Sequence, residues 1–224
     1  MKEKLSPKIQ EIYLRANQKF QEEQDYTGAI EDYTEVLKHT PNHLMALRQR
    51  GLAKQTINDF QGAIDDYTIA LNIEPEDATG YFNRGMCYTY SRQYEQSIPD
   101  YDKAFALGYK KIDIYQNRAY TKYLLKNYDE SITDYNHLIE LAPPNPNFYF
   151  IKALCHYNKD EFKEAIANFN ETLKLDPNRA QAYFYRGVSK KYSNDIDGAK
   201  SDMHQAIELG YEDAKDYLNK LNKA

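Results

Sequence analysis

The sequence of 224 residues has no long apolar stretch and no internal break in composition. No apolar run approaches the roughly 18 residues needed to span a bilayer, so we expect no membrane insertion. Residues 1 to 10 contain no apolar segment resembling a signal peptide, which predicts a cytoplasmic protein. Because no Gly/Ser-rich linker or low-complexity stretch divides the chain, we expect one continuous array.

Basic residues are not in excess either. The chain has 29 Lys and Arg against 34 Asp and Glu, a net charge of -5 and a pI of about 5.6. Nucleic-acid affinity rests largely on clustered Lys and Arg, so nucleic acid is not an expected partner. Apolar residues at 42% and charged residues at 28% are enough for an extended core and too balanced for disorder.

The motifs of common catalytic and metal sites are missing. The sequence contains no Gly-rich phosphate loop, nucleophile elbow or His-Glu metal motif. His39 and His43 are four residues apart but straddle Pro41, so they do not share a helical face. The other three histidines are expected on different helices. We therefore expect no enzyme, no metal site and no cofactor.

What the sequence does contain is a motif that returns every 34 residues. The motif is an aromatic residue, two further residues, Ala or Ser, Ile, two more residues and a second aromatic residue. Its aromatic pairs are Tyr26 and Tyr33, Phe60 and Tyr67, Tyr94 and Tyr101, Tyr128 and Tyr135, and Phe162 and Phe169, with a weakened copy from Ile196 to Met203. A period of this length is typical of a solenoid, in which each repeat buries its apolar face against its neighbours.

Each repeat predicts two helices joined by a short turn, because apolar residues recur at helical spacing in two runs. A short polar residue stands at the turn in four repeats, where it can cap the second helix: Asp25, Asp59, Asn127 and Asp195. Proline closes the second helix in four repeats, and Gly108 and Gly210 are expected to do so elsewhere in a left-handed conformation. Pro99 falls inside a second helix, where we expect a distorted first turn.

These columns resemble the tetratricopeptide repeat family. The resemblance covers residues 10 to 213 as six repeats, divided as 10–43, 44–77, 78–111, 112–145, 146–179 and 180–213. It includes a small residue at the eighth position of five repeats, namely Gly51, Gly85, Ala119, Ala153 and Gly187, and Asn17 departs from it in the first repeat. It implies an all-α fold, a right-handed superhelical solenoid of six helix-turn-helix repeats. Residues 1–9 would lead into a first helix that begins near Pro7, and residues 214–224 would form a C-terminal capping helix.

Two further columns carry opposite charges. The seventh position holds Arg50, Arg84, Arg118, Lys152 and Arg186, and the twenty-third holds Asp32, Asp66, Asp100, Asp134, Asn168 and Asp202. We predict that these residues form an arginine–aspartate ladder that fixes the stacking register of the repeats. The alternative is a set of independent solvated charges.

The two cysteines, Cys87 and Cys155, occupy the same position two repeats apart. Helices packed about 8 to 10 Å apart would separate them by roughly 20 Å, too far for a disulfide. We expect two buried free thiols.

In proteins of the resembled family, the first helices of successive repeats line a concave groove that binds a peptide or helix. The matching positions here are mostly polar and charged in the first two repeats, as at Arg15, Arg48 and Gln49, and aromatic later. Such a surface suits an apolar or aromatic segment of a partner protein. The alternative for any one aromatic residue is packing against adjacent helices. The candidate partner-binding residues are Phe82, Asn83, Met86, Tyr90, Asn117, Tyr120, Tyr123, Phe150, Leu154, Tyr157, Phe184, Tyr185 and Tyr192.

Chaperone-adaptor members of the family grip a terminal carboxylate with Lys, Asn and Arg. The best-placed residues here are Arg48, Leu52, Asn83, Asp113 and Asn117, so this basic grip is missing. The resemblance therefore favours a non-enzymatic scaffold or adaptor that binds a peptide or helix of a partner. Two alternatives stay open: a module whose self-association into homo-oligomers is the function, and a small-molecule or nucleic-acid site within the superhelix, which the acidic balance disfavours.

Overall fold

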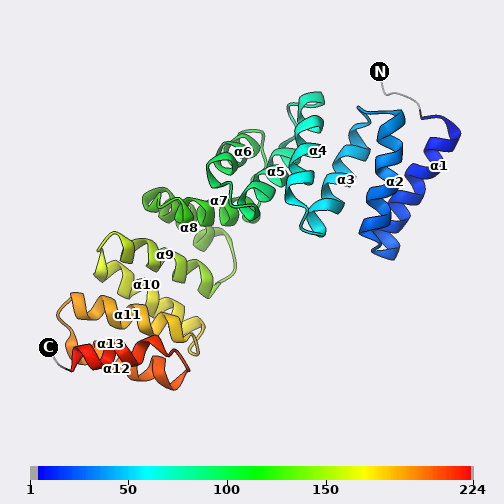
Figure 1. Cartoon of the computed structure of the whole chain (residues 1–224). Helices are drawn as coiled ribbons and strands as arrows, with labels where there is room; N and C mark the ends of the chain where they lie inside the picture. Colours follow the sequence, from blue (N-terminus) through cyan, green and yellow to red (C-terminus); the bar gives the residue numbers. More distant parts are fainter. Residues whose placement is uncertain (1–4, 223–224) are drawn as a thin grey trace. The chain divides into compact units, whose positions relative to one another are not determined.

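The chain folds as an all-α repeat solenoid. The computed structural model describes residues 5 to 222, and every regular element in that range is helical (Figure 1). The elements are α1 (Pro7–Gln18), η1 (Lys19–Glu23), α2 (Tyr26–His39), α3 (Leu44–Thr56), α4 (Phe60–Ile73), α5 (Ala78–Tyr90), α6 (Tyr94–Ala106), α7 (Ile112–Leu124), α8 (Tyr128–Leu141), α9 (Pro146–Asn158), α10 (Phe162–Leu175), α11 (Ala180–Tyr192), α12 (Ile196–Glu208) and α13 (Asp213–Leu221).

The helices form two compact units, an N-terminal unit of residues 1–114 and a C-terminal unit of residues 115–224. Within each unit a helix packs chiefly on the next helix in the chain, as α3 does on α4 and α9 on α10. Contacts of this kind are the property that defines a solenoid. The exact division into six repeats and the hand of the superhelix stay predictions.

The turn inside each helix pair uses a residue in the left-handed conformation. These residues recur at intervals of 34 with φ between 55° and 64°, and none of them is glycine: Gln24, Asn58, Arg92, Lys126, Asp160 and Asn194. In the turns after α6 and α12, Gly108 and Gly210 also have positive φ, as predicted. The chain therefore reverses direction after each of these helices without a long loop.

The predicted caps of the second helices form only where the third helical residue is glycine. The carboxylates of Asp25, Asp59 and Asp195 accept hydrogen bonds from Gly28 N, Gly62 N and Gly198 N at 2.9 to 3.0 Å. A Cβ on Gly28 would lie 2.1 Å from Asp25 Oδ2, so a larger residue would displace the cap. Asn127 makes no side-chain cap bond, and the matching position after it is Glu130. The prediction for Asn127 was wrong for this steric reason.

The first helix pair contains one extra residue, accommodated by the π-helix η1. Asp25 N donates to Lys19 O six residues earlier, whereas the same bond in the second pair joins Asp59 N to Lys54 O, five residues earlier. Because η1 absorbs this residue, the small position of the first pair is held by Ala16, which is fully buried, and not by Asn17. Asn17 instead accepts a hydrogen bond from the Tyr33 hydroxyl at 2.7 Å.

The predicted contacts between the arginine and aspartate columns are confirmed in four repeats, and their role in fixing the stacking register stays a prediction. Each rung is bidentate, with the arginine Nε and Nη2 donating to the two carboxylate oxygens of a buried aspartate 16 residues later. The rungs are Arg50 to Asp66, Arg84 to Asp100, Arg118 to Asp134 and Arg186 to Asp202, with N to O distances of 2.5 to 2.9 Å.

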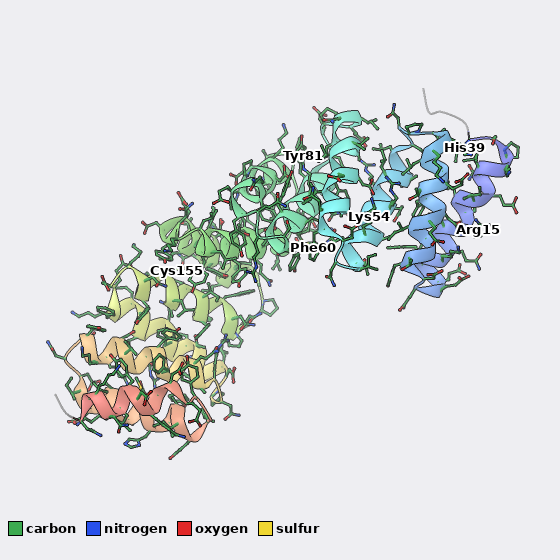
Figure 2. All side chains as sticks on the ribbon, viewed as in Figure 1. Arg15, His39, Lys54, Phe60, Tyr81 and Cys155 are labelled. Carbon is green, nitrogen blue, oxygen red and sulfur yellow. The ribbon has the colours of Figure 1, made fainter. Side chains whose placement is uncertain are left out.

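A further rung was missed from the sequence, because η1 shifts its arginine by one residue. Arg15, labelled with Lys54 in Figure 2, donates to Asp32 at 2.5 and 2.8 Å across 17 residues. Its guanidinium and the Lys19 amine hold the pKa of Asp32 below its usual range. In three rungs the arginine Nη1 also donates to the preceding second helix, to Thr34, Thr68 or Asn170. These three rungs therefore also link a helix pair to the pair before it.

Pro99 tightens the first turn of α6 without interrupting the helix. Gln96 N donates to Gln93 O three residues earlier, while in α4 the corresponding carbonyl of Asp59 receives Ala63 N four residues later. The helix is nevertheless continuous from Tyr94 to Ala106. The distortion is confined to a single tight turn, because proline lacks only one backbone donor and crowds one carbonyl.

The last helix, α13, covers the end of the array. Ala214, Leu218 and Leu221 are buried in one cluster with Val188 and Met203 of the preceding helix pair. This helix closes the apolar face that α11 and α12 would otherwise expose. Cys87 and Cys155 are both buried and free, as predicted.

Candidate functional site

A pocket of about 270 Å³ lies in the N-terminal unit between α3, α4 and α5. Its walls come from four residues of α3 at the positions predicted to line the groove and from the start of α5, and Tyr67 of α4 contributes to the lining. The lining residues are Met45, Arg48, Gln49, Leu52, Tyr67, Asp77, Thr79, Gly80 and Asn83. Of the candidate residues, only Asn83 lines this pocket.

Arg48 is the charged centre of the pocket. Its Nη2 lies 2.5 Å from Glu74 Oε2 and 2.5 Å from Asp77 Oδ2, so two carboxylates already compensate the guanidinium. The Arg48 Nε is buried and has no hydrogen-bond acceptor within residues 5–222. A buried donor without an acceptor costs free energy. The pocket therefore contains a charge-compensated guanidinium, without the excess positive charge that would attract a carboxylate.

Neutral hydrogen-bonding groups line the rest of the pocket. Gln49, Thr79 and Asn83 place amide and hydroxyl groups in the wall, while Met45 and Leu52 supply apolar surface. Asn83 also hydrogen-bonds the Tyr67 hydroxyl, which donates to Gln55 Oε1 at 3.2 Å. The combination suits an uncharged group with a carbonyl oxygen and an apolar side chain.

The other candidate residues of the N-terminal unit differ in exposure. Phe82 is only 4% exposed and stacks on Tyr109 with ring centroids 4.5 Å apart, so the packing alternative holds for it. Tyr90 is 58% exposed and stacks on Phe60 at 5.4 Å. Met86 is partly buried. Tyr90 is therefore the aromatic candidate of this unit that a partner can reach.

Two candidates of the C-terminal unit, Phe150 and Leu154, belong to its core. Phe150 and Leu154 are buried in one cluster with Phe169. The Arg179 guanidinium lies 3.8 Å from the centroid of the Phe150 ring. Tyr185, partly buried, packs edge-on to Tyr157 at 5.4 Å. Sequence position identifies the helix face but not the depth of burial, and the packing alternative holds for Phe150 and Leu154.

Two tyrosine side chains of the same unit are exposed to solvent. Tyr120 is 43% exposed and lies parallel to Tyr123, and Tyr192 is 54% exposed and stacks on Phe162 at 4.9 Å. Asn117, Tyr123, Tyr157 and Phe184 are partly buried. Phe184 packs against Tyr211 and against Tyr217 of α13. Each exposed tyrosine therefore stacks on a ring that contacts or belongs to a neighbouring helix: Tyr120 on Tyr123, which contacts Tyr128 of α8, and Tyr192 on Phe162 of α10.

Phenol groups dominate this part of the C-terminal unit. Burial raises the pKa of Tyr123 to about 12 and that of Tyr217 to about 12, and it also raises the pKa of Tyr157. Neighbouring tyrosines add to each shift. These hydroxyls therefore stay protonated near neutral pH, where they can donate hydrogen bonds to carbonyl oxygens.

Residues of the loop after α4 were missed as site residues. Glu74 and Asp77 flank Pro75 and hold Arg48, yet the groove positions implied by the resemblance lie on first helices only. Acidic residues on both sides of a helix-ending proline were the available signal. Within residues 5–222 there is no group of three or more His, Cys, Asp and Glu side chains arranged to hold a metal ion. In the same range no helix combines the length and apolar character of a membrane span.

The family model of the tetratricopeptide repeat matches residues 78–107, 112–145 and 146–179. Among solved structures, YrrB, described as a TPR protein with an unusual peptide-binding site, is 20% identical with a TM-score of 0.71; the match covers 80% of this chain and 92% of YrrB. A MamA structure is 21% identical, with a TM-score of 0.70 and coverage of 77% and 94%. Another, from Desulfovibrio magneticus RS-1, is 14% identical, with a TM-score of 0.69 and coverage of 74% and 94%. Comparison with curated proteins found no match.

Proposed function

Because the chain is a tetratricopeptide repeat protein, we propose that it is a non-enzymatic scaffold that binds a peptide segment of a partner protein. The observation that carries this proposal is the pocket between α3, α4 and α5, which combines neutral hydrogen-bonding side chains with apolar surface. YrrB, which shares the fold, is described as having a peptide-binding site.

The chemistry of the pocket favours the main chain of the partner over a charged side chain. The Gln49 and Asn83 amides would exchange hydrogen bonds with peptide groups of the partner's main chain. An apolar side chain of the partner would then contact Met45 and Leu52. A terminal carboxylate is disfavoured, because Glu74 and Asp77 already neutralise Arg48 and leave one negative charge in excess.

The exposed tyrosines form the second part of the proposal. Tyr90 in the N-terminal unit, and Tyr120 and Tyr192 in the C-terminal unit, would each contact an apolar or aromatic residue of the partner. Stacked support from a neighbouring ring limits the rotamer entropy that each tyrosine loses on binding. The remaining, partly buried candidates would orient the exposed tyrosines: Asn117, Tyr123, Tyr157, Phe184 and Tyr185.

A random-peptide display library selected on the immobilised full chain tests this function. Peptides that bind the wild type should lose at least about tenfold in affinity, or roughly 1.4 kcal/mol, with Gln49→Ala/Asn83→Ala or with Tyr120→Ala/Tyr192→Ala. The matched controls are Ile69→Ala and Leu141→Ala, which truncate exposed apolar residues on the second helices α4 and α8. Circular dichroism verifies that each variant is folded.

The alternative functions give different results in the same experiment. If no peptide is enriched and light scattering shows association that rises with concentration, self-association replaces the peptide-binding proposal. If selected peptides bind both groove variants as tightly as the wild type, the proposed residues are wrong even though the function stands.

A further inference from the structure

One helix pair lacks the aspartate that all the others place in the ladder. In the pair of α9 and α10 the two columns hold Lys152 and Asn168. The Asn168 amide donates to Glu164 O of its own helix at 2.8 Å, so it is turned along α10. Lys152 makes no hydrogen bond or ion pair with any residue between 5 and 222. It is a partly buried amine without a counter-ion.

Two charged groups of the neighbouring turns, Asp134 and His156, are engaged with other residues. Asp134 of α8 is held by Arg118 and Lys122 at 2.7 and 2.9 Å. His156, one helical turn after Lys152 on α9, pairs with Glu161 at 2.7 Å. Burial alone lowers the pKa of Lys152, and no carboxylate of α8 or α10 offsets it. A larger share of this amine is therefore neutral at pH 7 than for a paired lysine.

We propose that Lys152 is a preferred acceptor of acyl groups from small reactive acyl donors, such as acyl phosphates. The lone pair of the neutral amine attacks the acyl carbon and forms the C–N bond. The C–O bond to phosphate breaks, inorganic phosphate leaves, and the proton from the nitrogen passes to solvent. The product is a neutral amide. This inference is independent of the proposed partner binding.

The consequence of acylation differs between Lys152 and the lysines of the ladder. At Lys122 the amide would remove an ion pair to Asp134 and leave that buried carboxylate with one partner fewer. At Lys152 it would remove a charge that has no partner. Acylated Lys152 is therefore compatible with the folded helix pair, and the modified chain should accumulate.

Incubation of the full chain with acetyl phosphate at pH 7, followed by peptide mass spectrometry, tests the proposal. Lys152 should be acetylated at least about threefold faster than Lys122, which is also partly buried but is paired with Asp134, because burial without a counter-ion favours the neutral, nucleophilic amine. It should also react at least as fast as Lys163, an exposed lysine on α10.

The variant Asn168→Asp supplies the missing carboxylate and should lower the Lys152 rate to that of Lys122 while leaving Lys163 unchanged. Five helix pairs already carry aspartate at this position, so the variant should fold, and circular dichroism verifies it. Equal rates for Lys152 and Lys122 in the wild type, or a Lys152 rate that Asn168→Asp leaves unchanged, would overturn the proposal.

Discussion

At the scale of single residues, the partner of each buried charge decides what the residue contributes. Asp202 is nearly fully buried and receives two hydrogen bonds from Arg186 and a contact from Lys190. Its charge is compensated only while those groups remain. Lys152, at the position equivalent to Arg186, compensates nothing and carries the cost of its own burial.

This contrast predicts opposite outcomes for the same substitution. Arg186→Met should lower the free energy of unfolding by about 3 to 5 kcal/mol, because it leaves the Asp202 carboxylate partly unpaired in the core. Lys152→Met should change it by less than about 1 kcal/mol or increase it, since methionine fills similar space without a charge. Urea denaturation of both variants measures the difference. A comparable loss in the two would mean that Lys152 has a stabilising partner.

The ladder could be predicted from sequence because its residues recur at a fixed interval, whereas the depth of each aromatic side chain could not. Phe82 and Tyr90 are both on α5 and were both assigned to the groove, yet only Tyr90 is open to a partner. The difference arises because Tyr109, from the loop after α6, covers Phe82. The same contact recurs between Phe184 and Tyr211, so the Leu-Gly-Tyr sequence shared by the two loops was the available signal.

At the scale of the helices, η1 shows how an inserted residue is absorbed without disturbing the packing on either side. Arg15 before it bonds Asp32 after it as the other arginines of the ladder do, and Ala16 and Tyr33 are fully buried. The π turn widens the helix by one residue so that both sets stay in register. Sequence alignment by a fixed period of 34 misassigned the small position for this reason.

Deleting Glu22, an exposed residue of η1, should therefore convert the π turn to regular α-helix and change the free energy of unfolding by less than about 1 kcal/mol. Deleting Thr56 from α3, which has no extra residue, should rotate Arg50 by about 100° relative to α4. The resulting loss of the Arg50 to Asp66 rung should cost about 3 to 5 kcal/mol. Far-UV circular dichroism and urea titration compare the two deletions, and equal losses would contradict the register argument.

The helix boundaries followed from the repeat, but the capping of individual helices depended on a second residue. The aspartate caps form because Gly28, Gly62 and Gly198 leave room for the carboxylate. Among the second helices, a turn residue alone therefore predicts that a helix starts, and the glycine three residues later accompanies a side-chain cap. The rule does not extend to the first helices, since Asp77 precedes Gly80 by three residues and makes no cap bond.

At the scale of the whole molecule, the cores of both units depend on buried phenol groups. Tyr33 and Tyr67 are almost fully buried in the N-terminal unit, and Tyr135 is buried in the C-terminal unit. Burial raises the pKa of all three above the ordinary value for tyrosine. The folded chain therefore retains protons that the unfolded chain releases near pH 10.

Stability should accordingly fall at high pH. Since the folded pKa of these tyrosines lies above the unfolded value, their contribution is complete below about pH 10 and is lost as the pH rises beyond it. The urea midpoint measured by circular dichroism should decrease steadily between pH 9 and pH 11. Tyrosinate absorbance from the buried residues should appear together with the loss of helix. A midpoint that is the same at both pH values would show that these phenols ionise without unfolding.

Each unit also contains one cysteine, Cys87 in the first and Cys155 in the second, and both side chains are fully enclosed. Burial raises the pKa of Cys87 to about 12 and that of Cys155 to about 11, and only a thiolate reacts readily with alkylating reagents. Alkylation of either thiol therefore requires its helix pair to open. The natural chain thus carries a separate chemical reporter in each unit, and the rates at which the two cysteines are alkylated record how often each half opens, without any introduced label.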